Sequence, residues 1–260
     1  MLFILMQLIN LRLHLAGSRG FIIMKKSYRF VLSILLVCFM SAALPLFAES
    51  VSYGDMTFDK SDINSFDRPF MNAYSKPLDY TATGFELASL MTPLFLIPAP
   101  SQDYWKLGVE YAETIALAWG AKELAKHCVT RYRPYMYFDG APQSAIDDGD
   151  YKDSFFSGHA TLSFAAAGFT TYQALTYLPD SPYKWMTIGV SYALCTTTAV
   201  LRLASGNHFM TDVLCGALVG SALGFLIPWV NHYWFEPSID LPPKTALMVA
   251  PVGINFSVRF

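Results

Sequence analysis

Five long apolar runs constrain the fold of this chain more than any other feature of its sequence. Each is about 17–25 residues long, the length that a helix needs to cross a bilayer. The runs lie near residues 82–100, 105–125, 159–178, 184–201 and 210–230. Charged residues make up only 15% of the chain, against about 25% in ordinary soluble domains. We therefore expect an all-α helical bundle with five transmembrane helices.

Charged residues in the first two runs keep a soluble helical fold open as an alternative. Glu86 lies in the first run, and Glu110, Glu113 and Lys122 lie in the second. Such charges are costly in lipid and normally face the interior of a bundle. We expect these side chains on a polar inner or solvated face.

Three glycines mark one face of the last run. Gly216, Gly220 and Gly224 follow one another at four-residue spacing. Small residues at this spacing are typical of closely packed helices in membranes, and a soluble helical core can use them too. We expect this face to lie against another helix.

The N-terminal part of the chain reads as an export signal. A basic stretch, Met24-Lys-Lys-Ser-Tyr-Arg, is followed by an apolar stretch from Phe30 to Phe47, the pattern of a signal peptide or an uncleaved anchor. Met24 is an alternative to Met1 as the true start. The predicted segments are an over-translated start plus signal or anchor (1–48), an exported N-terminal segment (49–80), a helical domain (81–232) and a C-terminal tail (233–260).

Overall charge and cysteine spacing exclude two classes of partner. The net charge of -2 provides no basic surface, so we expect no nucleic-acid partner. None of the four cysteines lies at a metal-ligand spacing such as Cys-x-x-Cys. The oligomeric state is left open by the sequence.

Three short polar clusters lie at the ends of apolar runs. They are Lys126, Arg133 and Pro134; Ser157, Gly158 and His159; and Arg202, His208 and Asp212. Ser157 and Asn207 are suitable helix N-caps, and His208 and Asp212 lie one helical turn apart. Arginine and histidine beside a helix N-terminus suit a phosphate group.

Counting helix crossings places all three clusters on one face of the membrane. If residues 49–80 lie outside after export, the connection 126–158 and the segment 202–208 lie outside as well. An uncleaved anchor with its lysines inside gives the same result. We expect a bacterial-type inner-membrane protein with a periplasmic active site, the alternative being a soluble periplasmic protein.

The three clusters together resemble the signature of the type 2 phosphatidic acid phosphatase superfamily. The matching patterns are Lys-x6-Arg-Pro, Ser-Gly-His and Arg-x5-His-x3-Asp. This group includes membrane lipid phosphatases, bacterial acid phosphatases and vanadium haloperoxidases. Phe156 stands where the family usually has proline, and Leu201 where it usually has serine. Neither position supplies a reacting group, so the resemblance over residues 82–230 implies an active member of a divergent subfamily.

The resemblance implies a role for each matched residue. His208 is the nucleophile that forms a phosphohistidine, Asp212 holds its imidazole in the right tautomer, and His159 is the general acid and then the base. The implied phosphate-binding residues are Lys126, Arg133, Ser157, Gly158 and Arg202. These cations stabilise the phosphoryl charge, so no metal ion and no other cofactor is expected.

The expected activity is metal-independent hydrolysis of phosphate monoesters or diphosphates of membrane lipids. The expected partners are a phosphorylated lipid substrate and the membrane itself. Three alternatives stay open: a soluble exported non-specific acid phosphatase, a vanadate-dependent haloperoxidase, and a non-catalytic protein that binds or transports phospholipid.

Overall fold

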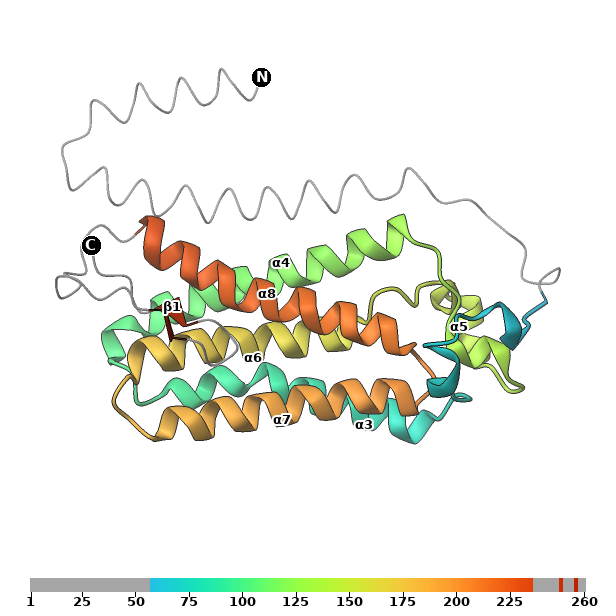
Figure 1. Cartoon of the computed structure of the whole chain (residues 1–260), viewed down its shortest axis with the longest axis horizontal. Helices are drawn as coiled ribbons and strands as arrows, with labels where there is room; N and C mark the ends of the chain where they lie inside the picture. The colour runs from blue at the N-terminus through green and yellow to red at the C-terminus, as the bar shows by residue number, and fades with distance from the viewer. Residues whose placement is uncertain (1–56, 236–247, 250–254, 257–260) are drawn as a thin grey trace, which may run out of the picture.

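The computed structural model describes residues 57–235, 248–249 and 255–256 (Figure 1). The predicted signal or anchor, residues 1–48, and most of the predicted tail lie outside these ranges. In the described part of the chain, five long helices run along the bundle, which confirms the predicted all-α fold: α3 (Lys76–Leu90), α4 (Tyr104–Cys128), α6 (Gly158–Tyr177), α7 (Tyr183–Ala204) and α8 (Met210–Phe235).

Short elements fill the connections between these helices. They are α5 (Gln143–Asp147) and the 3-10 helices η3 (Lys60–Asp62), η4 (Arg68–Phe70), η5 (Thr92–Leu96), η6 (Ser101–Asp103), η7 (Pro134–Tyr137) and η8 (Asp150–Lys152). Two short strands, β1 (Met248–Val249) and β2 (Asn255–Phe256), pair in antiparallel fashion.

The first predicted run does not form one continuous helix. Helix α3 begins at Lys76, inside the predicted N-terminal segment, and it ends at Leu90. The 3-10 helix η5 follows, with Pro93 at its start. Proline has no amide hydrogen, and its ring clashes with the carbonyl four residues earlier, so the α-helix cannot continue through this position.

Two helices of the described part are long and apolar enough to cross a membrane, residues Tyr183–Ala204 of α7 and Met210–Tyr233 of α8. Length and composition make these two helices candidate membrane spans. Helix α3 has only 15 residues, and α4 carries Glu110, Glu113 and Lys122. That all five helices span the membrane stays a prediction.

Helix α6 is the centre of the bundle and packs against the four other long helices. Its contact with α8 is the closest, because the glycines of α8 face its backbone. A Cβ atom on Gly216 would lie 2.7 Å from the Ser157 carbonyl oxygen, and one on Gly220 would overlap the Thr161 carbonyl. This confirms the helix-packing role predicted for the glycines. It also fixes the start of α6 beside the start of α8.

Candidate active site

The three predicted clusters meet at one end of the bundle, beneath the connection that contains α5 (Figure 1). Lys126 lies in the last turn of α4, and Arg202 in the last turn of α7. His159 lies in the first turn of α6. His208 lies just before α8, and Asp212 lies in the first turn of that helix. Four helix ends therefore contribute to one site, as expected from counting the helix crossings.

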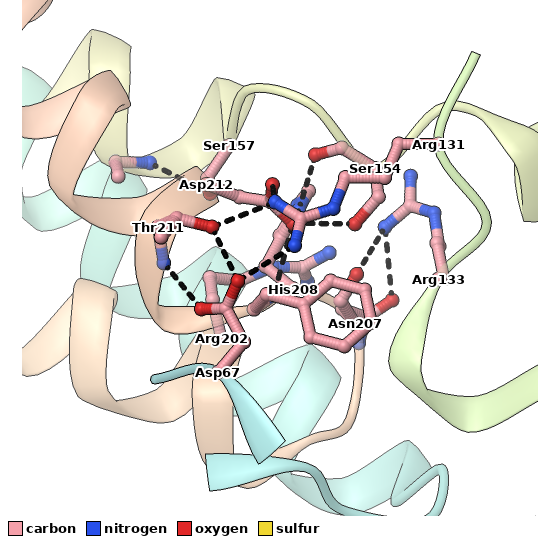
Figure 2. A network of polar contacts seen from close by, with 12 residues as sticks. Asp67, Arg131, Arg133, Ser154, Ser157, Arg202, Asn207, His208, Thr211 and Asp212 are labelled. Atoms are coloured by element: carbon pink, nitrogen blue, oxygen red, sulfur yellow. Dashed lines mark hydrogen bonds and ion pairs between the residues drawn. The ribbon is translucent and has the colours of Figure 1, made fainter. Parts of the chain in front are cut away.

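His208 is almost completely buried, and one of its ring nitrogens is bound by the main chain. Its Nδ1 atom lies 2.8 Å from the Ser154 carbonyl oxygen, whereas the nearest Asp212 oxygen is 3.8 Å away (Figure 2). A carbonyl can only accept a hydrogen bond, so Nδ1 carries the hydrogen. Nε2 is then left with its lone pair. The direct orienting contact expected from Asp212 is made by Ser154 instead.

The electrostatic surroundings keep the His208 ring neutral. Burial lowers the pKa of His208 well below its usual value, and the nearby charges of Arg133, Arg202 and Lys126 lower it further. Only the neutral imidazole has a nucleophilic lone pair. The site therefore presents His208 in the form that can attack phosphorus.

Asp212 is a fully buried carboxylate with three donors around it. Ser154 Oγ donates to it at 2.6 Å, the Phe209 amide donates at 2.9 Å, and Arg131 forms an ion pair with it. The bond to the Phe209 amide caps α8, because the Phe209 carbonyl accepts the first intrahelical bond from Val213. The aspartate thus connects the start of α8 to the loop that carries Ser154.

The predicted N-cap of α8 was wrong, and that of α6 is confirmed. Asn207 does not cap α8; its side chain binds Ser205 and accepts a hydrogen bond from Arg133. Ser157 caps α6, with its Oγ accepting from the Ala160 amide at 3.4 Å. The amide of Ser157 donates to the Asp212 carbonyl oxygen at 3.1 Å. A phosphate would therefore meet the hydroxyl of this residue and the start of α6 rather than that amide.

His159 faces α3, a helix with no part in the predicted signature. Its Nε2 atom lies 3.3 Å from Glu86 Oε2 and 3.3 Å from Thr83 Oγ1. The Glu86 side chain is mostly buried, in line with the expectation that this charge faces the bundle interior. Glu86 and Thr83 are site residues that the sequence pattern missed.

Two buried arginines, Arg133 and Arg202, lie at the site, and each forms an ion pair with a carboxylate. Arg202 forms an ion pair with Asp79 of α3, and its Nε atom is buried without a hydrogen-bond partner among the described residues. Arg133 binds Asp150 through the carboxylate at 2.5 Å and through the carbonyl at 2.9 Å. A buried donor without a partner is costly. The free Nε of Arg202 therefore suits an anionic ligand.

Lys122 and Gly158 form a close contact beside the site. A Cβ atom on Gly158 would lie 2.8 Å from Lys122 Cδ, so glycine lets the lysine pass the start of α6. Lys122 also forms an ion pair with Glu123. Together with Lys126 it adds positive charge near His159.

Arg131 and Asp67 form a polar network that the sequence pattern also missed (Figure 2). Arg131 binds Thr211 at 2.7 Å, Asp67 at 2.7 Å and Asp212. The sequence did contain one indication for Arg131. It lies two residues before the motif residue Arg133, and side chains two residues apart in an extended segment point to the same side. Asp67 had no such signal, because it is distant in sequence and lies in a segment without a motif.

Within the described residues, no three or more His, Cys, Asp or Glu side chains are placed so that they could hold a metal ion.

Comparisons with known proteins agree with the resemblance seen in the sequence. The family model of the PAP2 superfamily matches residues 107–236. Lipid A 1-phosphatase of Porphyromonas gingivalis is 31% identical over 136 residues, which cover 52% of this chain and 26% of that protein. Undecaprenyl-diphosphatase of Sulfolobus acidocaldarius is 29% identical over 122 residues, covering 46% of this chain and 53% of that protein.

A solved structure adds to this comparison. It is a transmembrane PAP2-type phosphatidylglycerolphosphate phosphatase from Bacillus subtilis, with 20% identity and a TM-score of 0.44. The match covers 79% of this chain and 96% of that chain. Both curated relatives carry phosphatase names, in agreement with the enzyme class predicted from the sequence. The family model covers half of the chain and includes all three clusters, so this protein belongs to the PAP2 superfamily.

Proposed function

We propose that this protein is a phosphatase that hydrolyses phosphate monoesters or diphosphates of membrane lipids without a metal ion, through a phosphohistidine on His208. One observation carries the proposal: the main chain fixes the hydrogen of His208 on Nδ1, which leaves Nε2 as a nucleophile among buried cations. A histidine that served only to fill the core would not need this charge around it.

The reaction would proceed in two steps. In the first, Nε2 of His208 attacks phosphorus and the bond to the leaving oxygen breaks. Burial and the nearby cations lower the pKa of His159, so this ring would take up a proton only when the bound phosphate anion offsets those cations; it then gives that proton to the leaving oxygen. In the second, His159 takes a proton from water, the water oxygen attacks phosphorus, and the bond to Nε2 breaks to release phosphate. The Ser154 carbonyl stabilises the positive charge on the His208 ring through its bond to Nδ1–H.

The cations of the site would bind the phosphoryl oxygens. Arg202 offers its unpartnered Nε, and Arg133 and Lys126 add charge close to His208. Charge stabilisation of this kind dominates phosphoryl transfer. Ser157 and Gly158 would contribute the hydroxyl and the start of α6.

A phosphorylated lipid is the substrate class that the surroundings favour. Both curated relatives are named for phosphorylated lipids. Two helices of this chain are long and apolar enough to lie in a bilayer, and the site lies at the end of both of them. A headgroup at the membrane surface would reach the site directly. Candidate substrates are phosphatidic acid, phosphatidylglycerol phosphate, a polyprenyl diphosphate and a lipid A phosphate.

Exposed tryptophans gather at the end of the bundle away from the site. Trp105 and Trp185 are exposed at the starts of α4 and α7, and Trp229 is exposed towards the end of α8. All three lie at the end of the bundle away from His208, where an aromatic belt would mark the opposite membrane surface. If the segment before α3 is exported, as the sequence predicts, the site at the same end of the bundle would lie outside the cytoplasm.

The test of the function is phosphate release by the purified full-length protein in detergent with EDTA present. Lipid substrates are compared with a soluble aryl phosphate. Release from a lipid in EDTA, with a phosphorylated histidine located by peptide mapping at neutral to basic pH because phosphohistidine is labile in acid, supports the proposal. Release that requires a divalent metal contradicts it. Carbonate extraction of membranes separates a membrane enzyme, which stays in the pellet, from a soluble exported phosphatase.

Removing one phosphate-binding cation should weaken the enzyme without abolishing it. We expect Arg133→Ala to lower kcat/KM about 10²- to 10³-fold, because one preorganised donor in a water-excluded site is worth roughly that much. The measurement is steady-state phosphate release from the same lipid. Lys184→Ala, which removes a cation at the opposite end of the bundle, is the control and should retain wild-type kcat/KM.

The neutral state of His208 predicts a specific pH behaviour. Its pKa lies well below 6.5, so the ring should stay neutral as the pH falls from 8 to 5.5. Histidine-labelled protein in detergent is titrated by NMR, and the signal missing from His208→Ala identifies the residue. No change in that signal over this range is expected. A midpoint near 6.5 would contradict the buried, cation-surrounded environment.

A further inference from the structure

We propose that Asp67, in the segment before the first helix of the bundle, is a positioning residue for the nucleophile, a role that rests on the proposed phosphatase activity. It acts through Arg131, and through its own bonds to Thr211, on the loop and helix start that carry His208 (Figure 2). Asp67 lies outside residues 107–236, the part that the family model matches.

Asp67 is a fully buried carboxylate with an unusually complete set of donors. Its oxygens accept from Arg131 Nη2 at 2.7 Å, from the Thr211 amide at 2.9 Å and from Thr211 Oγ1 at 2.7 Å. Asn64 adds a further bond at 2.7 Å and also accepts from the Asp67 amide. Each of these partners fixes the carboxylate in one orientation. Such a group is buried only where it is bonded on all sides.

Arg131 bridges Asp67 and Asp212. One of its Nη atoms binds Asp67, and the other binds Asp212 and Thr211. Its guanidinium lies 4.2 Å from the centre of the Phe209 ring. Asp67 and Arg131 together therefore contact three residues at the start of α8, directly after His208 in the sequence: Phe209, Thr211 and Asp212.

The chain of contacts continues from Arg131 to the His208 ring. Asp212 accepts from Ser154 Oγ, and the Arg131 carbonyl accepts from the Ser154 amide at 2.9 Å. The Ser154 carbonyl then accepts from His208 Nδ1–H at 2.8 Å. Ser154 is thus held at its amide and at its hydroxyl, so its carbonyl is aimed at the imidazole. Without Asp67, Arg131 loses one of the two carboxylates that hold it. The Ser154 carbonyl is then held less firmly in its orientation towards His208 Nδ1.

The variant that tests the role is Asp67→Asn, which keeps the size of the side chain and removes its charge. We expect kcat to fall about 10- to 100-fold with KM little changed, because small misplacements of a reacting group have effects of this size. Asp62→Asn removes an exposed carboxylate from the same segment and should match the wild type. Rates are divided by the phosphoenzyme burst, so that only folded sites count.

A second variant tests the path through Arg131. Because Asp67 also binds Thr211 directly, the pair Asp67→Asn with Arg131→Gln should be slower than Arg131→Gln alone, but by less than the product of the two single losses. Effects that multiply in the double variant would overturn the proposed path. The NMR signal of the His208 Nδ1 hydrogen gives a readout independent of turnover: it should shift in Asp67→Asn and stay in place in Asp62→Asn.

The outcomes for the two proposals are distinguishable. An Asp67→Asn protein with wild-type kcat per active site overturns the positioning role and leaves the phosphatase proposal standing. A wild type that releases no phosphate from any of the compounds overturns the phosphatase proposal. In that case an unmoved His208 Nδ1 signal in Asp67→Asn would overturn the structural coupling as well.

Discussion

Replacing His208 with alanine is expected to lower phosphate release by about 10⁴-fold or more, to the level of the background, because the covalent step loses its nucleophile. The ring is fixed by the Ser154 carbonyl, and its pKa is lowered by burial and by the neighbouring cations. No other described side chain offers a neutral imidazole at the same place. The measurement is phosphate release from phosphatidic acid and from an aryl phosphate, in detergent with EDTA.

The matched control is His127→Ala. His127 is an exposed histidine in the last turn of α4, bound to the Glu123 carbonyl, and its removal should leave the rate unchanged. Full activity of His208→Ala would overturn the phosphohistidine mechanism. Inactivity of the wild type towards every phosphate compound, with phospholipid still bound, would instead favour the non-catalytic alternative.

Gly220→Ala should destabilise the protein by about 3 kcal/mol or more, an unusually large effect for one methyl group. The added Cβ would overlap the Thr161 carbonyl oxygen of α6, which is backbone and cannot turn away as a side chain can. Helices α6 and α8 would have to separate, and His159 and His208 would move apart with them. Thermal unfolding in detergent and phosphate release at low temperature would measure the two consequences.

The same substitution on an open face supplies the control. A Cβ on Gly189, an exposed residue of α7, would meet nothing within 4 Å. Gly189→Ala should therefore be neutral or stabilising by up to about 1 kcal/mol, because alanine favours a helix more than glycine does. Equal thermal stability of the two variants would show that the contact between α6 and α8 is looser than described.

The sequence predicted the motif residues of the site but not the partners that hold them. Lys126, His159 and Arg202 stand at helix ends, and the order of apolar runs is enough to bring such ends together. Asp67 and Asp79 bind residues 64 and 123 positions away. Local sequence patterns such as helix periodicity and capping cannot predict contacts between residues so far apart in the chain.

Local rules also failed where tertiary contacts competed with them. Asn207 has the side chain of an N-cap, but Arg133 and Ser205 use its polar atoms, and the Phe209 backbone takes the capping position. Helix α3 was predicted too late, because its first turn is polar: Asp79 there binds Arg202 of the site. Both exceptions, Asn207 to the N-cap rule and Asp79 to the apolar pattern of the helix, bind an arginine of the site.

The glycine face of α8 has a consequence for how this protein can change over evolution. Main-chain atoms of α6 and α8 set the distance between the two histidines, whereas Leu214, Leu218 and Leu226 of α8 are exposed and take no part in it. This exposed surface is thus free to change with its surroundings while the distance between the histidines stays fixed. Homologues adapted to different bilayers could therefore share one catalytic centre with little sequence in common outside it.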